Sequence, residues 1–213
     1  MKYQETREKV LEIAIKCAKA GLIHGAEGNV SGRVPGEDAC VITPSGIPYE
    51  SLKPEDLPVV TLHGEVIDGE YKPSSETPMH TAIFRVRPNV NGVVHTHSKY
   101  ATVFSVLQKE IPAMVPPSSA FAPVPCAAFQ LPGSEELGQE VVATLGTDHL
   151  ACTMQNHGQI AAAPTLDMAY RGAEVVEEVA EIAYLSMQAG SLNPVPADAV
   201  VELRRRALKG QAV

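Results

Sequence analysis

Apolar residues recur at helical spacing in five stretches of the chain. In residues 5–20 they line one face of a helix, and the pattern stops at Gly21, as is typical of an amphipathic helix with a glycine after its last turn. The same spacing predicts four further helices, over residues 76–85, 99–107, 135–145 and 166–189. Ser134 and Thr165 precede the last two helices and are suited to cap them.

Short runs of β-branched and other apolar residues indicate strands between these helices. Such runs lie at residues 40–43, 59–62, 93–97 and 150–154. Residues 62–66 have the composition of a hairpin turn, and short connections of this kind favour an antiparallel or mixed sheet covered by helices. Residues 116–125, rich in proline, serine and alanine, are expected to form an irregular loop within the domain.

The length of the chain and the hydropathy of its sequence indicate how many domains to expect and whether the chain contains a membrane span or a signal peptide. With 213 residues the chain is long enough for one large domain, and no composition shift divides residues 1–213, so a single domain is expected. No apolar stretch approaches the roughly 18 residues of a membrane span, and the charged amino terminus lacks the apolar region of a signal peptide. We therefore expect a cytoplasmic protein that does not bind membranes.

Charge and cysteine spacing exclude further classes. A formal net charge of −8 and the absence of tryptophan argue against nucleic-acid binding, and the one basic run, residues 204–206, is expected to be a solvated helix face. The four cysteines are widely spaced and contain no Cys-x-x-Cys pair, which argues against a zinc finger or a disulfide framework. They are expected to be reduced core residues: Cys17, Cys40, Cys126 and Cys152.

Three histidines and a glutamate indicate a metal site. Side chains alternate between the faces of a strand, so His95 and His97 point the same way and can present two nitrogens to one ion. His157 follows another apolar run, and Gly158 is expected to let the backbone turn beside it. With Glu76 the site would offer three nitrogens and one oxygen, and a carboxylate displaced by substrate becomes free to act as a base.

Each histidine also has a simpler interpretation. A single histidine is more often a satisfied core or surface residue than a ligand, and His24, His63 and His149 are assigned to that class. His80 lies one helical turn after Glu76 and could face the same site, and we expect a supporting or packing role for it.

Three segments combine glycines with hydroxyl groups and could cradle an anion through backbone N–H groups. They are residues 25–32, 43–46 and 74–75, although each segment alone is equally consistent with an ordinary turn. The chain contains neither Gly-x-x-x-x-Gly-Lys nor a Gly-x-Gly-x-x-Gly after a strand, so a small phosphorylated metabolite fits better than a nucleotide.

The order of five motifs carries a family resemblance. They are Gly-Asn-Val-Ser at 28–31, Thr-Pro-Ser-Gly-Ile-Pro-Tyr-Glu at 43–50, Pro-Ser-Ser-Glu at 73–76, His-Thr-His at 95–97 and Asn-His-Gly at 156–158. Over about residues 20–160 the chain thus resembles the class II aldolases of the L-fuculose-1-phosphate aldolase type. The resemblance implies a three-layer α/β/α sandwich with a central, mainly antiparallel sheet. It also implies one divalent metal ion per subunit, usually Zn²⁺ with Mn²⁺ or Co²⁺ as alternatives, and a homotetramer with active sites at subunit interfaces.

The resemblance also assigns roles to individual residues. It implies that His95, His97, His157 and Glu76 bind the metal, with Glu76 as the acid and base. It implies that the substrate phosphate is held by Gly28, Asn29, Ser45, Gly46, Ser74 and Ser75. The expected reaction cleaves a ketose 1-phosphate to dihydroxyacetone phosphate and an aldehyde, with the metal stabilising an enediolate. The ketose is expected to be fuculose 1-phosphate or a 5-deoxy- or 5-methylthio-pentulose 1-phosphate.

Differences from the fuculose enzyme bear on the substrate. The similar sugar-phosphate 4-epimerases carry aspartate where Glu76 stands, which favours an aldolase. After residues 111–113 the chain lacks the tyrosine of the fuculose enzyme, and a second tyrosine near the carboxyl terminus is also missing. An apolar aldehyde tail in contact with Met114, Val115 and Phe121 is therefore expected. The alternatives are a decarboxylase or methylthioribulose-phosphate dehydratase of this fold, a 4-epimerase, or a non-catalytic interaction module.

Overall fold

One sheet forms the centre of the computed structural model, which describes residues 2–209. Its strand order is β4-β3-β2-β1-β5-β8-β7-β6, and neighbouring strands run antiparallel except β6 and β7. The strands are β1 (Gly28–Arg33), β2 (Ala39–Ile42), β3 (Val59–Thr61), β4 (Val66–Asp68), β5 (Gly92–Thr96), β6 (Cys126–Ala127), β7 (Ala151–Met154) and β8 (Gly158–Ala163).

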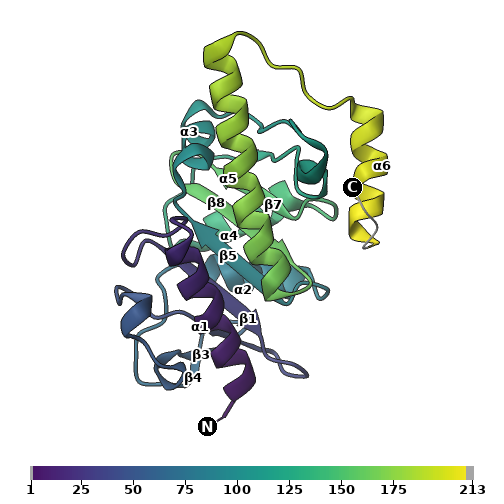
Figure 1. The fold of residues 1–213 in the computed structure, drawn as a ribbon. Coiled ribbons are helices and arrows are strands. Elements are labelled where there is room, and N and C mark those ends of the chain that lie inside the picture. Colours follow the sequence, from purple (N-terminus) through teal and green to yellow (C-terminus); the bar gives the residue numbers. More distant parts are fainter. Residues whose placement is uncertain (1, 210–213) are drawn as a thin grey trace.

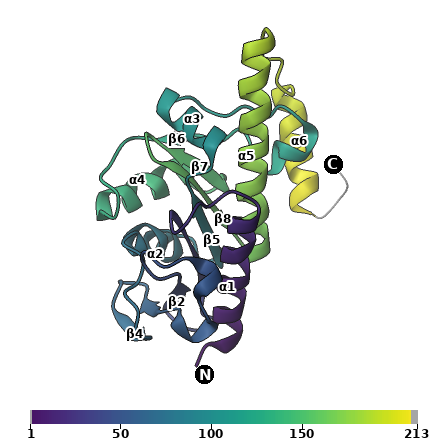
Figure 2. The ribbon, with the colours of Figure 1, turned by 60° about the vertical axis from the view of Figure 1, so that its left-hand side comes forward.

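Helices cover both faces of this sheet (Figures 1 and 2). The helices α1 (Gln4–Lys19), α3 (Lys99–Leu107) and α5 (Leu166–Ala189) share one apolar core with the sheet. The helices α2 (Thr77–Val86) and α4 (Glu135–Leu145) share a second core on the opposite face. The three-layer α/β/α sandwich with a mainly antiparallel sheet is therefore confirmed.

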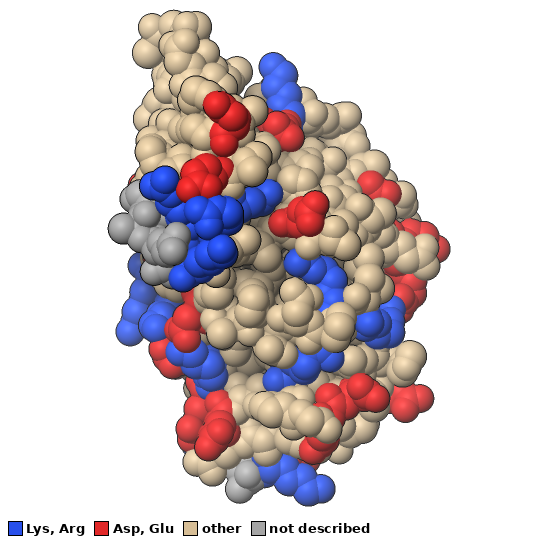
Figure 3. Space-filling model, turned by 90° about the vertical axis from the view of Figure 1, so that its right-hand side faces the viewer, with Lys and Arg blue, Asp and Glu red and all other residues tan. Residues whose placement is uncertain are grey.

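The carboxyl-terminal helix α6 (Ala197–Leu208) lies outside these layers and packs on a short 3₁₀ helix, Pro116–Ala120. That 3₁₀ helix occupies part of the segment expected to be irregular; two others lie at Tyr49–Ser51 and Pro54–Asp56. On the face that α6 forms, basic and acidic side chains lie next to each other (Figure 3). Arg205 and Arg206 are exposed and each place Nε 2.8 Å from the Glu202 carboxylate, as expected of a solvated helix face. The expectation is wrong for Arg204, which is partly buried and donates from Nε to the Ala120 carbonyl oxygen over 3.3 Å, because α6 packs on the 3₁₀ helix there.

The predicted helices and caps agree with the structure. The bounds of α3, α4 and α5 are as predicted, and those of α1 and α2 differ by one residue at each end. The hydroxyl of Ser134 accepts a hydrogen bond from the N–H of Leu137, and that of Thr165 accepts one from Met168. Among residues 2–209, no helix has both the length and the apolar character needed to cross a membrane.

Two central strands, β1 and β8, are absent from the predicted set. The sequence analysis describes residues 25–32 as a turn, either anion-binding or ordinary, but Gly28–Arg33 form β1 between β2 and β5. This part of the prediction is wrong because small residues replace the β-branched run that normally marks a strand. A Cβ atom at Gly32 would lie 2.9 Å from the Leu166 side chain and 3.0 Å from that of Val10, so the glycine allows α1 and α5 to approach the sheet.

The cysteines agree with the prediction in three of four positions. Cys17, Cys40 and Cys152 are buried and free, whereas Cys126 is partly exposed at the sheet edge. The expectation that all four are core residues is therefore wrong for Cys126, because β6 has two residues and only one neighbouring strand, β7.

Candidate metal and phosphate site

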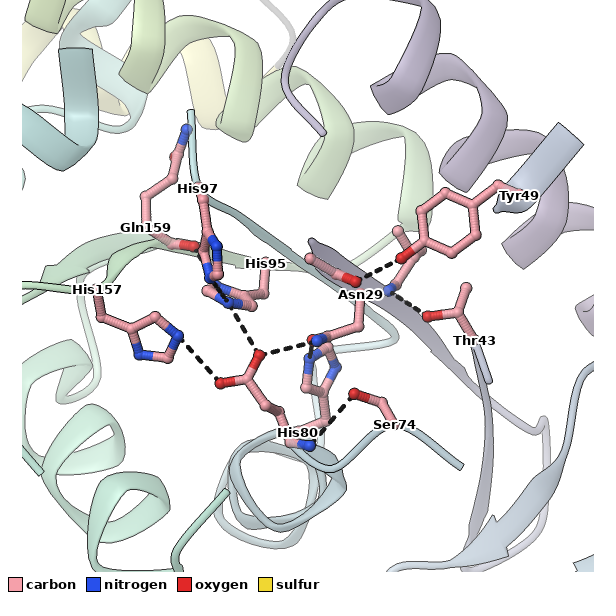
Figure 4. Close-up of polar contacts among 12 residues, drawn as sticks. Asn29, Thr43, Tyr49, Ser74, His80, His95, His97, His157 and Gln159 are labelled. Atoms are coloured by element: carbon pink, nitrogen blue, oxygen red, sulfur yellow. Dashed lines mark hydrogen bonds and ion pairs between the residues drawn. The ribbon is translucent and has the colours of Figure 1, made fainter. Parts of the chain in front are cut away.

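The sheet brings the four predicted metal ligands together at one end of β5 (Figure 4). His95 belongs to β5, His97 follows its last residue, His157 lies in the turn between β7 and β8, and Glu76 immediately precedes α2. One ligand atom from each of the four lies within 4.8 Å of the others. His24, His63 and His149, assigned to the simpler class, are not members of this cluster.

The turn that carries His157 depends on its two neighbours in different ways. Asn156 adopts the left-handed conformation with φ 56°, which asparagine tolerates better than most residues. Gly158, expected to make the turn, instead allows close packing, since a Cβ atom there would collide with the carbonyl oxygen of Thr96 and lie 2.9 Å from the His97 ring. The expectation for Gly158 is thus corrected from a turn residue to a close contact between strands.

The imidazoles are oriented so that their Nε2 atoms converge. His95 Nε2 lies 3.0 Å from His97 Nε2 and 3.0 Å from Glu76 Oε2, and His157 Nε2 lies 3.2 Å from Glu76 Oε1. His95 Nδ1 lies 2.8 Å from the backbone oxygen of Gln159, which accepts its hydrogen. In the neutral ring this leaves the lone pair of Nε2 directed at the other ligands.

A divalent cation fits these residues. An imidazole lone pair and a carboxylate oxygen at 3.0 Å repel each other unless a positive charge lies between them. Glu76 Oε1 and His157 Nδ1 are also buried without a hydrogen-bond partner, and Glu76 is only 7% exposed. Buried polar atoms are normally paired, so this cluster has the donor chemistry and the unmet electrostatic need of a metal site.

The local charges set the protonation of the site. Burial alone would raise the pKa of Glu76, but the facing imidazoles of His95 and His157 outweigh it and hold that pKa well below its usual range. Burial, reinforced by His95 and His157, lowers the pKa of His97 to about 4. Near neutral pH the site therefore combines an ionised carboxylate with a neutral His97, the forms that bind metal ions.

His80 is linked to this cluster through the side chain of Asn29. It is fully buried, with Nε2 2.5 Å from Asn29 Oδ1, and Asn29 Nδ2 lies 2.9 Å from Glu76 Oε2. Burial, with a smaller effect of His95, lowers the pKa of His80 to about 3. The supporting role expected for His80 agrees with these contacts.

A cavity of about 310 Å³ opens beside the four residues. Its lining includes all six residues assigned to phosphate, which are Gly28, Asn29, Ser45, Gly46, Ser74 and Ser75. Backbone contacts fix these segments to each other: Ser74 N donates to Thr43 O over 3.1 Å, and Ser45 N donates to Lys72 O over 3.0 Å. Residues of all three segments that the sequence describes as possible anion cradles or ordinary turns thus line one cavity.

Gly28 and Tyr49 hold the start of β1 against this wall. Gly28 has φ 134°, and a Cβ atom there would lie 2.7 Å from the carbonyl oxygen of His95. The Tyr49 hydroxyl donates to the carbonyl oxygen of Gly28. Only glycine fits at this position, so β1 can lie this close to the end of β5 beside the cavity.

The residues expected to contact an apolar aldehyde tail do not line this cavity. The described residues that line it do not include Met114, Val115 or Phe121. Phe121 is 5% exposed and packs against Gly172 of α5, so within one chain this part of the expectation is wrong. Pro132 lines the cavity instead, and no periodic pattern or motif in the sequence indicates it.

The fold and the site together define a class II aldolase. A family model described as the class II aldolase and adducin N-terminal domain matches residues 8–184, and the chain belongs to this family.

Named relatives agree with this assignment. The chain is 36% identical over 207 residues to the 5-deoxy-D-ribulose 1-phosphate aldolase of Bacillus thuringiensis serovar kurstaki, covering 97% of each protein. A solved structure of an L-fuculose 1-phosphate aldolase superposes with a TM-score of 0.93 at 27% identity, covering 98% of each chain. The L-fuculose-1-phosphate aldolase of Thermus thermophilus gives a TM-score of 0.76 at 27% identity, covering 89% of this chain and 98% of that one. The chain is accordingly an enzyme of the aldehyde-lyase class.

Proposed function

We propose that residues 1–213 act as one catalytic domain that cleaves a ketose 1-phosphate into dihydroxyacetone phosphate and an aldehyde. The observation that carries the proposal is the juxtaposition of two features. Four potential metal ligands lie within 4.8 Å of one another, and they adjoin a cavity whose lining includes hydroxyl, amide and glycine backbone groups.

His95, His97, His157 and Glu76 would hold the metal ion, and three nitrogens with one carboxylate oxygen favour Zn²⁺. Mn²⁺ and Co²⁺ are the alternatives. When bound, such an ion supplies Lewis-acid stabilisation of the negative charge that develops next to the substrate carbonyl.

Glu76 is the proposed proton carrier. Cleavage breaks the bond between C3 and C4 of the ketose and leaves the electron pair on C3, while the C4 hydroxyl gives its proton to solvent water and becomes the aldehyde. Glu76 takes up a proton from solvent and delivers it to C3 in this direction, and it removes that proton in condensation. Asn29 orients the carboxylate for this transfer by donating to Oε2 over 2.9 Å.

The phosphate end of the substrate would lie against Gly28, Asn29, Ser45, Gly46, Ser74 and Ser75. Among the described residues that line the cavity, none is a lysine or an arginine. Backbone N–H groups and hydroxyls would therefore bind the anion, as they do in other glycine-rich phosphate sites.

The aldehyde end is proposed to be apolar. Pro132 lines the cavity, and the same loop carries Phe129 and Leu131, whose side chains are 49% and 69% exposed. A 5-deoxypentulose 1-phosphate has a methyl group where these residues would meet the substrate. The relative at 36% identity is named for such a compound, which favours it over fuculose 1-phosphate, with the 5-methylthio analogue as the alternative.

We also propose a cytoplasmic homotetramer with active sites at its subunit interfaces. Exposed apolar side chains at several places on the surface support an assembly, among them Val66, Ile67, Val106 and Leu107. Light scattering at several protein concentrations measures the assembly, and a monomer throughout would contradict it.

Release of dihydroxyacetone phosphate tests the function directly. The purified protein is incubated with 5-deoxyribulose 1-phosphate, with and without chelator, and dihydroxyacetone phosphate is reduced by a coupled NADH-dependent dehydrogenase. Chelator-sensitive oxidation of NADH is expected. Substrate loss without dihydroxyacetone phosphate would favour a dehydratase or epimerase. No turnover in a screen of further ketose phosphates would favour a decarboxylase, which needs a carboxylated substrate, or an interaction module.

A further inference from the structure

A buried chain of polar contacts leads from β1 to the proposed proton carrier, and Figure 4 shows its members His80 and Asn29. Ser31 Oγ lies 2.6 Å from His80 Nδ1, His80 Nε2 lies 2.5 Å from Asn29 Oδ1, and Asn29 Nδ2 lies 2.9 Å from Glu76 Oε2. Ser31 and His80 are both 0% exposed, and neither lines the cavity. Substrate would thus touch the end of the chain, at Asn29 and Glu76, but not its beginning.

The direction of every hydrogen bond in this chain follows from its last member. An ionised carboxylate only accepts hydrogen bonds, so the Asn29 atom that faces Glu76 is the amide nitrogen. Oδ1 of Asn29 then faces His80 and only accepts, so His80 Nε2 carries the hydrogen. In the neutral ring Nδ1 has no hydrogen, and the Ser31 hydroxyl donates to it.

We propose that His80 is a positioning residue, which holds the Asn29 amide with its nitrogen toward Glu76, and that Ser31 stabilises the tautomer of His80 that can do so by donating to Nδ1. The proposal rests on the proposed function for its kinetic effect, but its hydrogen-bond pattern is independent of any substrate.

Without the hydrogen bond from His80, the side-chain amide of Asn29 would be free to rotate. If the amide turned over, Oδ1 would face Glu76 Oε2 where Nδ2 now lies at 2.9 Å, and two acceptors would repel each other. Glu76 would then lose the donor that orients it, while the metal ligands and most phosphate donors would remain. Loss of a residue that orients a metal-site ligand typically lowers activity by roughly 10–100-fold. We expect this loss of activity to appear as a lower kcat.

The tautomer can be measured without substrate. The metal-loaded protein labelled with ¹⁵N-histidine is examined by long-range ¹H–¹⁵N correlation NMR, and the His80→Leu variant identifies the signals of His80. A hydrogen on Nε2 and a bare, hydrogen-bonded Nδ1 are expected. A hydrogen on Nδ1, alone or together with one on Nε2, would overturn the proposal whatever the enzyme's substrate is.

Kinetics of four variants test the positioning effect. Ser31→Ala and His80→Leu should lower kcat, by up to about 10-fold and by roughly 10–100-fold, while His80→Gln, which keeps a donor toward Asn29, should recover part of the loss. In the His80→Leu background, Ser31→Ala should have no further effect, because it acts through His80. The control is Ser118→Ala, at a buried serine that donates to Val115 O over 2.7 Å and lies outside the cavity.

Parallel measurements separate positioning from other roles. Metal content and the inhibition constant of inorganic phosphate should stay within about threefold of wild type in Ser31→Ala, because the metal ligands and most phosphate donors are unchanged. Independent losses from Ser31→Ala and His80→Leu, or a fall in metal content that matches the fall in kcat, would overturn the proposal. If wild-type protein turns over no ketose 1-phosphate, the proposed function fails, and the NMR result still decides the tautomer.

Discussion

Replacement of Glu76 by glutamine tests the proton-transfer role at the centre of the proposed mechanism. The change is nearly isosteric, and a glutamine carbonyl oxygen can still accept the hydrogen bond that Asn29 Nδ2 makes over 2.9 Å. The three histidines remain, so the fold and most metal binding should survive. The amide cannot take up the proton at C3.

The expected loss in kcat is about 10²–10⁴-fold, the usual contribution of a positioned general acid or base. This corresponds to roughly 2.7–5.4 kcal/mol in the activation free energy. The cavity offers few substitutes, since Glu27 is the other carboxylate among its described lining residues. We therefore expect the measured loss to be far above the tenfold effect of a general disturbance.

The assay compares kcat, metal content and thermal unfolding of Glu76→Gln with those of wild type. Glu65→Gln, at an exposed position in the turn between β3 and β4, is the matched control for the same chemical change. Turnover within about fivefold of wild type, with metal bound, would refute the reasoning and move the base to another residue. Loss of metal together with activity would assign Glu76 mainly to metal binding.

Three further outcomes are expected. Elemental analysis of protein purified without chelator should give about one divalent metal per chain; less than about one-tenth with activity intact would contradict the site. In the folded protein a thiol reagent should react quickly only with Cys126, because burial raises the pKa of Cys17 and Cys40 to about 12 and also raises that of Cys152; Cys126→Ser should abolish the fast phase. Comparative kcat/KM values should favour 5-deoxyribulose 1-phosphate over fuculose 1-phosphate; a tenfold preference for fuculose 1-phosphate, about 1.4 kcal/mol, would show the opposite specificity.

The helices of the two layers could be predicted closely because each carries its own signal, whereas α6 (Ala197–Leu208) is absent from the predicted set. The period of apolar residues and the caps at Ser134 and Thr165 are local, and the structure places α4 and α5 at the predicted bounds. The strands β2, β3, β5 and β7, which carry β-branched or other apolar runs, are recognisable for the same reason, whereas the short edge strands β4 and β6 are absent from the predicted set. The strand β8 is not, because Ala161, Ala162 and Ala163 have low strand propensity, although all three are fully buried.

The residues that converge at the site could be predicted, but their connections could not. His95 and His97 follow from the alternation of a strand, whereas Glu76 and His157 are placed beside them through the order of motifs. The contact between Asn29 and Glu76 joins residues 47 positions apart, and no periodic pattern encodes it. The sequence accordingly assigns Asn29 to phosphate alone, whereas it also touches the proposed acid and base.

The two central strands that pattern recognition misses, β1 and β8, flank the strand that carries His95. β5 lies between β1 and β8, with Asn29 opposite His95 on one side and Ile160 opposite His95 on the other. Gly28 lets β1 lie close to the carbonyl oxygen of His95, and Ala161 leaves room for Gly172 of α5 against one face of the sheet. Small residues weaken the strand signal and at the same time make room for the ligands and the helices above them. Failure of local prediction at this point is therefore a consequence of the same packing that permits the chemistry.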